Sequence, residues 1–348
     1  MDEETLAISS EQLPYFRTDE FSQIMFESDA ILKKLLGTVP ETKSMYLTAS
    51  GTAAMEAAVM NMLTKDDKAL IIDGGLFGRR FVKLCLEVHG IPYEAIDVPF
   101  GTAFSGEMLQ PYKNKGFTAM LVNLHETSTG QLYDINEISK FCKSENICLI
   151  IDAISTFLVD DFEMDRFGIA ATIISSQKGL GLAPGLSMLY INEETYKKRV
   201  KNNTPATLYL NFNDYVTDMQ RGQTPYTPAV GILLQLHEKL KRIEEITLKK
   251  VIDNNYKLAL HFRKRLNETM FTYPDYPLSN SVTPVFCPQD NAEKIISQLI
   301  EKWEIYVVPN PKPHNNDYFR AGHMGMGVTI QDMDLLIEKL KELEHLNA

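Results

Sequence analysis

One lysine stands out because an apolar run precedes it and small residues surround it. Lys178 comes shortly after residues 170–174, Ala-Ala-Thr-Ile-Ile, and is followed by Gly179 and Gly181. β-branched residues closed by glycines are typical of a buried strand that ends in a turn. An amine held in a partly desolvated place has a lowered pKa and can attack an aldehyde as a nucleophile. Lys178 is therefore a candidate for a lysine that forms a Schiff base.

An aspartate at the end of a second apolar run supplies a complementary group. Asp152 closes residues 147–152, Ile-Cys-Leu-Ile-Ile-Asp. A lysine for a Schiff base and an aspartate for a pyridinium nitrogen are the two groups that pyridoxal 5′-phosphate (PLP) requires of a protein. The sequence therefore predicts PLP as the cofactor and Lys178 and Asp152 as the catalytic pair. No metal is expected.

Composition narrows the possible partners and surroundings. The net charge of −11 argues against a nucleic-acid partner, which usually needs a basic face. No apolar stretch reaches the roughly 18 residues of a membrane helix, and the acidic start lacks the features of a secretory signal. The four cysteines form no C-x-x-C pair, so we expect reduced packing residues. A cytoplasmic protein without a membrane partner is the expectation.

The first two-thirds of the chain alternates strand and helix signals. Such alternation predicts a parallel sheet covered on both faces, an α/β architecture. The expected strands are residues 45–48, 69–72, 93–98, 118–123, 147–152 and 170–174, and the expected helices are residues 52–63, 81–88 and 134–144. Residues 202–226 form a long irregular stretch, and loops of that length are usually functional.

From about residue 228 the pattern changes. Two long amphipathic helices, 230–246 and 248–269, precede short strands at 281–286, 305–308 and 318–321 and a final helix at 331–346. This order predicts a smaller α+β domain. The expected division is an N-terminal arm (1–15), a large PLP-binding domain (16–245) and a small C-terminal domain (246–348).

A Ser-Gly-Thr triplet lies between a predicted strand and a predicted helix. Backbone N–H groups and hydroxyls at Ser50, Gly51 and Thr52 would form an anion site suited to a cofactor phosphate. A helix N-cap by Ser50 or Thr52 is the simpler interpretation of the triplet alone. The phosphate interpretation gains weight because Lys178 and Asp152 end other strands, and open α/β sheets bind ligands along that edge.

Several other polar or aromatic residues have two interpretations each. The segment 125–130, His-Glu-Thr-Ser-Thr-Gly, could offer a hydroxyl to a phenolic oxygen or could be a hydrophilic turn. Phe77 could stack on a planar cofactor or fill the core. His125 and His323 could act as bases, although a structural role is favoured for both because a Schiff-base lysine can itself carry protons.

Together these motifs resemble the class V PLP-dependent aminotransferases. The resemblance rests on residues 50–52, 126–130, 152–156 and 175–179 and extends from about Arg17 to the C-terminal helix. The most similar branch comprises alanine–glyoxylate/serine–pyruvate aminotransferase and 2-aminoethylphosphonate–pyruvate aminotransferase. It implies the type I PLP-dependent transferase fold, with a mainly parallel sheet in the large domain and a smaller C-terminal α+β domain.

The resemblance also implies a role for each candidate residue. Lys178 would hold the cofactor and move the proton, and Asp152 would keep the pyridine nitrogen protonated. Phe77 would stack on the ring, and Thr127 would bond its phenolic oxygen. The phosphate would be bound by Ser50, Gly51, Thr52 and Gln177.

Two further residues connect the resemblance to partners. Thr227 matches a residue that reaches the phosphate site of a second subunit, which implies a homodimer with shared active sites. Arg320 matches the arginine that binds the substrate carboxylate. The implied reaction transfers an amino group from a small amino acid, of the alanine or serine type, to a keto acid such as pyruvate or glyoxylate. It proceeds by ping-pong kinetics through pyridoxamine phosphate.

Two departures from the family leave alternatives open. Residues 2–15 contain a single proline and no glycine, where members commonly have a Gly-Pro-rich segment, and Thr224 replaces a frequent tyrosine. The donor could instead be 2-aminoethylphosphonate or aspartate. A PLP-dependent lyase or cysteine desulfurase shares the fold, and Cys287 is the thiol to test. A non-catalytic PLP-fold protein, or an α/β protein with a solvent-facing Lys178, is the remaining alternative.

Overall fold

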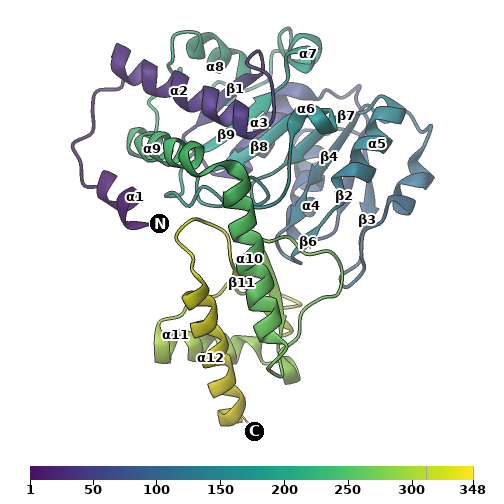
Figure 1. The fold of residues 1–348 in the computed structure, drawn as a ribbon. Helices are drawn as coiled ribbons and strands as arrows, with labels where there is room; N and C mark the ends of the chain where they lie inside the picture. The colour runs from purple at the N-terminus through teal and green to yellow at the C-terminus, as the bar shows by residue number, and fades with distance from the viewer. Residues whose placement is uncertain (311, 348) are drawn as a thin grey trace.

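A computed structural model describes residues 1–310 and 312–347 (Figure 1). A large upper part is built around a seven-stranded sheet, and a smaller lower part holds a two-stranded sheet. Across the large sheet the order is β1 (Lys43–Leu47), β9 (Ser187–Ile191), β8 (Ile169–Ser175), β7 (Cys148–Asp152), β4 (Ala119–Asn123), β2 (Ala69–Asp73) and β3 (Tyr93–Asp97). The strands from β8 to β3 are parallel, and β9 runs antiparallel to both of its neighbours. The predicted α/β class with a mainly parallel sheet is confirmed.

Both faces of the large sheet are buried, which explains why its strands are continuous apolar runs. In β2, for example, Leu70 and Ile72 belong to the core on one face, and Ala69 and Ile71 belong to the core on the other. The first face is covered by α2 (Asp19–Leu35), α5 (Ile135–Glu145), α6 (Met164–Phe167) and α9 (Val230–Ile246). The second face is covered by α3 (Gly51–Met62), α4 (Leu76–Lys83) and α8 (Phe212–Met219).

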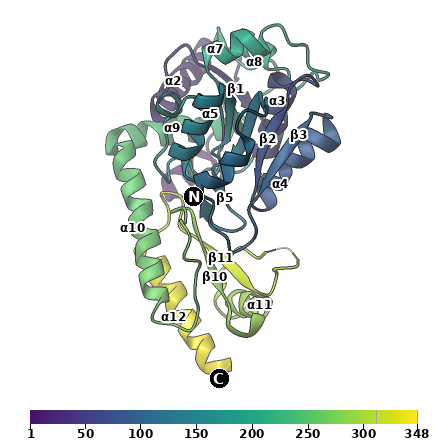
Figure 2. The same cartoon turned by 90° about the vertical axis from the view of Figure 1, so that its right-hand side faces the viewer.

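The lower part has a core of its own around β10 (Val282–Phe286) and β11 (Tyr318–Gly322), which pair antiparallel. Its helices are α11 (Ala292–Trp303) and α12 (Ile330–Asn347). The long helix α10 (Leu248–Leu266) joins the two parts (Figure 2): Val251 packs in the upper core, and Leu258 and Phe262 pack in the lower one. The proposed division at residues 245 and 246 falls where α9 meets α10, and it stays a prediction.

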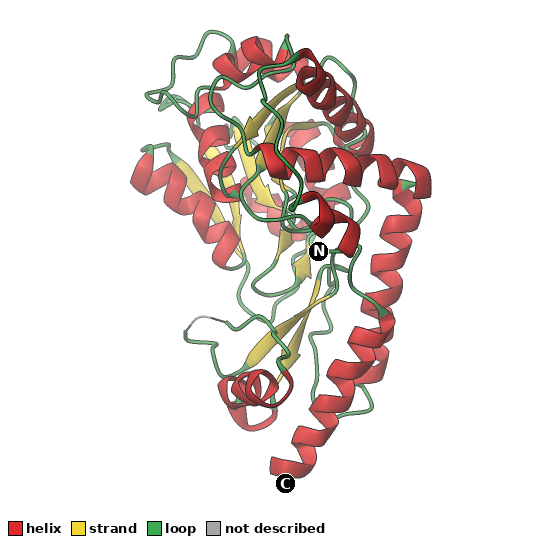
Figure 3. Ribbon diagram, turned by 90° about the vertical axis from the view of Figure 1, so that its left-hand side faces the viewer, coloured by secondary structure: helices red, strands yellow, loops and turns green. Residues whose placement is uncertain are grey.

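The N-terminal residues lie beside the junction of the two parts in each view (Figure 3). Helix α1 (Glu3–Ile8) packs on α9 there, and Asp2 caps it by accepting a hydrogen bond from the Thr5 N–H. Short elements complete the chain: β5 (His125–Glu126), β6 (Gln131–Leu132), α7 (Glu193–Thr195), π-helical turns at Leu84–Val88 and Tyr196–Val200, and 3-10 turns at Gly106–Tyr112 and Pro288–Asp290. Among the described residues, no helix has the length and apolar character needed to cross a membrane.

Three predicted elements differ from the structure. Residues 305–308 form no strand, because only Val308 pairs with Arg320 in an isolated bridge. The stretch 202–226 is not wholly irregular, since α8 lies within it, capped by the Asn211 side chain. The helix predicted at 81–88 begins earlier, as α4, and ends in the π-helical turn. Its start is stabilised by the distant Glu126 carboxylate, which local sequence patterns could not indicate.

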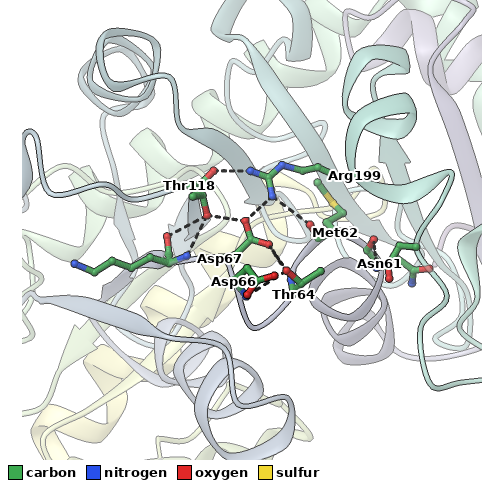
Figure 4. Close-up of polar contacts among 9 residues, drawn as sticks. Asn61, Met62, Thr64, Asp66, Asp67, Thr118 and Arg199 are labelled. Atoms are coloured by element: carbon green, nitrogen blue, oxygen red, sulfur yellow. Dashed lines mark hydrogen bonds and ion pairs between the residues drawn. The ribbon is translucent and has the colours of Figure 1, made fainter.

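Polar contacts join Asp67, Thr118 and Arg199 at the edge of the sheet where the parallel strands begin (Figure 4). We call these three residues the polar bracket. Arg199 Nη1 lies 2.8 Å from Asp67 Oδ1, and Arg199 Nη2 donates to the Thr118 carbonyl at 2.9 Å. The Thr118 hydroxyl donates to the same Asp67 oxygen at 2.7 Å. Asp67 and Thr118 precede β2 and β4, so the bracket ties two strand starts to the Arg199 turn. The polar bracket therefore lies at the edge opposite to the one where these strands end.

Candidate active site

Polar residues gather where the parallel strands end. Asp73, Asn123, Asp152 and Ser175 are the last residues of β2, β4, β7 and β8. Asn123 and Asp152 are direct register partners, so the loops that follow β4 and β7 leave the sheet side by side. Because the carboxyl ends of parallel strands share one edge, the segments after them converge on one site.

Asp152 is a buried carboxyl group whose environment disfavours its charge. Burial raises its pKa to about 6, while a hydrogen bond from the Ile154 N–H, 2.9 Å from Oδ1, and the cations of Arg80 and Lys178 act in the opposite direction. Burial dominates because water is excluded from the carboxylate. A protonated ring nitrogen placed against Asp152 would supply a further donor and a positive charge.

Lys178 is half-buried at the same edge. Burial lowers its pKa, as do the positive charges of Arg320 and Arg80, and only Asp152 opposes them. One alternative left open by the sequence was an α/β protein with a solvent-facing Lys178. The structure does not have a solvent-facing lysine at this position. A lysine in this setting keeps a larger neutral fraction at pH 7 than an exposed one, which favours attack on a carbonyl carbon.

The start of α3 is open for an anion. Ser50 is the N-cap residue, yet its side chain makes no capping hydrogen bond, so the N-cap interpretation of its hydroxyl is not supported. Gly51 is closely packed, since a Cβ there would lie 2.3 Å from Ile154 Cδ1. The Thr52 hydroxyl accepts a hydrogen bond from Arg80 Nη1 at 3.0 Å. Unpaired N–H groups, hydroxyls and a guanidinium together form a setting suited to a phosphate.

Phe77 is held at the start of α4 by a residue that the sequence did not single out. The fully buried Glu126 carboxylate accepts hydrogen bonds from the N–H groups of Phe77 at 3.1 Å and Gly78 at 3.0 Å. Arg80 lies over the Phe77 ring, 4.8 Å from its centroid. The sequence offered one indication of a special role for Glu126, because it is a carboxylate next to the hydroxyl residues 127–129.

Thr127 lies at the centre of a buried hydroxyl cluster. Its Oγ1 is 2.8 Å from Ser155 Oγ, which is 2.9 Å from His125 Nδ1. Burial, with Lys178 next in effect, lowers the pKa of His125 to about 3, so the ring is neutral. His323 is likewise buried and has a pKa lowered by burial to about 3. Neither histidine is placed to act as an exposed base, as the structural interpretation expected.

Arg320 brings the lower part of the molecule to the site. Its guanidinium is buried, and it donates to the carbonyl oxygens of Thr127 at 3.0 Å and Pro309 at 2.7 Å. No carboxylate pairs with it among the described residues, and its Nε has no hydrogen-bond partner there. Burial lowers its pKa, which reflects the cost of an uncompensated buried charge. A ligand carboxylate would offset that cost.

The structure thus joins most of the predicted site residues and separates one. Contacts or electrostatic effects connect Asp152, Lys178, Thr52, Phe77, Thr127 and Arg320. Gln177 is half-buried beside Lys178 in the chain. Thr227 is exposed between α8 and α9, and no described hydrogen bond links it to the group. The roles of Glu126 and Ser155, and the place of Arg80 beside Thr52, were not predicted from the sequence.

The residues present fit PLP as a ligand. Asp152 suits a pyridinium nitrogen, Lys178 suits an aldehyde carbon, and the α3 N-terminus with Thr52 and Arg80 suits a phosphate. An open cleft of about 540 Å³, lined by residues 73–76, 79, 97–100, 128–129, 310, 312–314 and 318, adjoins this group, although Lys178, Asp152 and Thr52 do not line it. Its lining residues Leu76 and Tyr318 are close in the chain to Phe77 and Arg320, and the volume is in the range of small-molecule sites.

A desulfurase thiol is not part of this arrangement. Cys287 follows β10 in the lower part, is 6% exposed, and has a pKa raised by burial to about 12. A thiol in that state is neither ionised nor accessible, whereas a desulfurase needs a reactive thiolate. All four cysteines are free.

The chain is similar to known proteins in sequence and in fold. The family model described as aminotransferase class V matches residues 15–308. The chain is 30% identical to the soluble hydrogenase 42 kDa subunit of Anabaena cylindrica, over 92% of this chain and 84% of that protein. It is 25% identical to L-aspartate–glyoxylate aminotransferase of Paracoccus denitrificans, over 89% and 80%. The crystal structure of alanine–glyoxylate aminotransferase from Nostoc sp. superposes with a TM-score of 0.91, covering 98% and 92% of the two chains at 23% identity.

Proposed function

Because the chain belongs to the class V aminotransferase family, we propose that it transfers an amino group from a small amino acid to a keto acid with PLP as cofactor. The donor is of the alanine or serine type, and the acceptor is a keto acid such as pyruvate or glyoxylate. The observation that carries the proposal is the placement of Arg320. A buried guanidinium without a carboxylate partner among the described residues acts electrostatically on Lys178, which in turn lies close to Asp152.

Each of these residues has a definite task in that reaction. When bound, PLP supplies an electron sink that makes the α-hydrogen of an amino acid acidic. Asp152 accepts a hydrogen bond from the protonated ring nitrogen, Thr127 bonds the phenolic oxygen, and Phe77 packs on the ring face. Arg320 binds the substrate carboxylate through charge-assisted hydrogen bonds. Lys178 Nζ, once free, takes the proton from the substrate α-carbon.

The phosphate is bound by Ser50, Gly51, Thr52 and Gln177, and Arg80 adds a positive charge beside Thr52. One site serves both half-reactions, so the donor leaves as a keto acid before the acceptor enters, and the kinetics are ping-pong. Thr227, exposed in a single chain, reaches the phosphate of a second subunit, and the enzyme is a homodimer with shared sites. The four free cysteines support a cytoplasmic location.

The charges around the site favour a donor with one carboxylate. Three arginines could be considered for a second carboxylate, and each already has a partner. Arg79 pairs with Asp73, Arg221 pairs with Asp218, and Arg80 donates to Thr52. This supports alanine or serine over aspartate. The name of the Paracoccus denitrificans relative keeps aspartate as the alternative donor to test.

The proposal is tested by mixing the PLP-loaded protein with single amino donors and following the visible absorbance of the bound cofactor. We expect alanine or serine to remove that absorbance and pyruvate or glyoxylate to restore it. Lys178→Ala should bind PLP noncovalently and show no donor-dependent change. Release of ammonia or sulfide instead of recovery would replace transamination by a lyase reaction.

The same assay tests the carboxylate site. Arg320→Met should weaken donor binding by about 2–4 kcal/mol, or ~30- to 1000-fold, because an interaction between buried charges is lost. Arg221→Met, which breaks only the pair between the exposed Arg221, just after α8, and Asp218, is the matched control and should leave donor affinity unchanged. Equal affinity in the Arg320 variant would move the carboxylate site elsewhere.

A further inference from the structure

A buried chain of three polar side chains runs away from the site behind Thr127. Thr127 Oγ1, Ser155 Oγ and His125 Nδ1 are linked by successive distances of 2.8 and 2.9 Å. All three residues are at most 6% exposed, so water does not compete for their hydrogen bonds. His125 comes from β5 and Ser155 from the turn after β7. The chain therefore depends on two separate loops at the same sheet edge.

The direction of the hydrogen bonds follows from the groups available. Each hydroxyl carries one proton, so the chain can point toward Thr127 or away from it. If it pointed away, Ser155 would donate to His125 Nδ1, and the proton of the ring would be on Nε2. His125 Nε2 is buried and has no partner among the described residues, so its N–H would be an unsatisfied donor. The charged groups that act on the ring are the cations of Lys178, Arg320 and Arg263, and they disfavour a second proton on it.

We propose that His125 and Ser155 are positioning residues that orient the Thr127 hydroxyl proton outward, toward an anionic oxygen of the ligand. His125 Nδ1–H donates to Ser155 Oγ, and Ser155 O–H donates to Thr127 Oγ1. Thr127 then has its only proton free for the oxygen in front of it. The identity of that oxygen, the phenolic oxygen of PLP, rests on the proposed function, whereas the chain behind Thr127 does not.

The neutral state of His125 keeps this direction fixed over the pH range of an enzyme assay. Burial lowers its pKa to about 3, with Lys178, Arg320 and Arg263 adding to the effect. The ring therefore neither gains a second proton nor loses the one on Nδ1 between pH 5 and 9. Without His125, Ser155 Oγ is free to accept from Thr127, which leaves the ligand oxygen facing a lone pair. Without Ser155, Thr127 loses the O–H donor that polarises its own hydroxyl, so it becomes a weaker donor to the ligand.

The consequence is a shift in a titration of the bound cofactor. If PLP is bound to Lys178, its phenolic oxygen would bear more negative charge at high pH than at low pH, and Thr127 would be the residue that donates to it. A donating Thr127 hydroxyl stabilises the deprotonated state and lowers the pH at which the absorbance changes. Weakening the donor should raise this midpoint by about half to one pH unit, the size that one hydrogen bond gives.

The experiment compares the pH dependence of the cofactor absorbance in three test variants and two control variants. Ser155→Ala and His125→Asn should each raise the midpoint, and the double variant should raise it no further than Ser155→Ala because the chain is already broken. The matched controls are Ser187→Ala and His323→Asn, which remove a buried hydroxyl and a buried ring outside the chain. Neither control should move the midpoint.

The ring tautomer gives a second readout that needs no cofactor. Nitrogen NMR of the cofactor-free protein, with the His125 signals identified by their loss in His125→Asn, should show a neutral ring protonated on Nδ1 from pH 5 to 8. An Nε2–H ring, or an unchanged midpoint in both Ser155→Ala and His125→Asn while PLP still binds to Lys178, would overturn the inference alone. Failure of the unaltered protein to bind PLP, with the Nδ1–H ring observed, would overturn the proposed function and leave the chain intact.

Discussion

At the scale of single residues, Asp152 shows how burial of a carboxyl group lowers the free energy of unfolding. Its carboxyl group is buried with a pKa of about 6, well above the usual value of 3.8. Between those two pH values the folded protein holds a proton that the unfolded chain has released. The stability of the cofactor-free protein therefore falls as pH rises from about 4 to 6, and the full penalty is present at neutral pH.

Asp152→Asn should accordingly stabilise the cofactor-free protein at pH 7.5. A shift of about two pKa units corresponds to ~2–3 kcal/mol, and the amide oxygen can still accept from the Ile154 N–H. Urea denaturation at pH 4.5 and 7.5 measures the gain, which should be small at the lower pH. Asp160, with a pKa also raised by burial to about 6, retains a slope of the same sign. Asp253→Asn, an exposed control on α10, should change neither value; a gain that is equal at both pH values would contradict the linkage.

Single residues also show what the sequence could predict and what it could not. The placement of Lys178 and Asp152 at one sheet edge could be predicted because Asp152 ends a strand and Lys178 comes shortly after another, so a local pattern carries the information. Glu126 and Ser155 could not, because their partners lie far along the chain: Glu126 bonds Phe77 and Gly78, and Ser155 bonds Thr127 and His125. Thr227 was named from a resemblance, and its role stays a prediction.

At the scale of elements, the local sequence pattern was sufficient to predict strands that are buried on both faces of the sheet. The parallel strands were predicted because burial on both faces leaves continuous apolar runs, as in β4 and β8. Helix α4 was misplaced because two glycines precede it and its start depends on the Glu126 carboxylate. The prediction of a strand at residues 305–308 was wrong. An alternating pattern does not distinguish a strand of a sheet from a segment that makes a single bridge to it.

The bracket at the opposite edge offers a test of element-level stability. Burial raises the pKa of Asp67, but hydrogen bonds from Arg199, Thr118 and Thr64 more than reverse this, so the net shift is downward. Arg199→Met leaves a largely buried carboxylate without its cation, and we expect a loss of about 2 kcal/mol in the free energy of unfolding. Because the pKa of Asp67 is lowered in the folded state, that loss should shrink as pH falls below about 4.

The neighbouring Lys198→Met is the control for this experiment. Lys198 pairs with Glu194 at the surface, where both side chains are more than 70% exposed, and such pairs contribute ~0–1 kcal/mol. Urea denaturation should separate the two variants, while PLP affinity should stay the same in both because the bracket lies at the far end of the strands. An equally small effect of both substitutions would mean that Arg199 is not a structural anchor.

At the scale of the whole molecule, the candidate site joins segments from both parts. Lys178 and Asp152 come from the large sheet, whereas Arg320 comes from β11 and is held against the Thr127 carbonyl. Helix α10 packs in both cores, so it couples the position of Arg320 to the large sheet. Movement of the lower part would therefore change the distance between the Arg320 guanidinium and Lys178.

A second copy of the chain completes the site in our proposal, and this can be tested by mixing two inactive variants. Lys178→Ala lacks the nucleophile, and Thr227→Glu places a negative charge where the partner's phosphate is expected to lie. In a mixed dimer, one site receives Lys178 from the second variant and Thr227 from the first, so it contains neither defect.

If subunits mix at random, half of the dimers are mixed and each has one intact site. We therefore expect recovery of about a quarter of the activity of the unaltered protein. Recovery should require refolding together or subunit exchange, and it should be absent when Lys178→Ala is mixed with Asp152→Asn, because both residues belong to the same site of one chain. Equal activity in the two mixtures, or none in either, would show that Thr227 does not serve the partner's site.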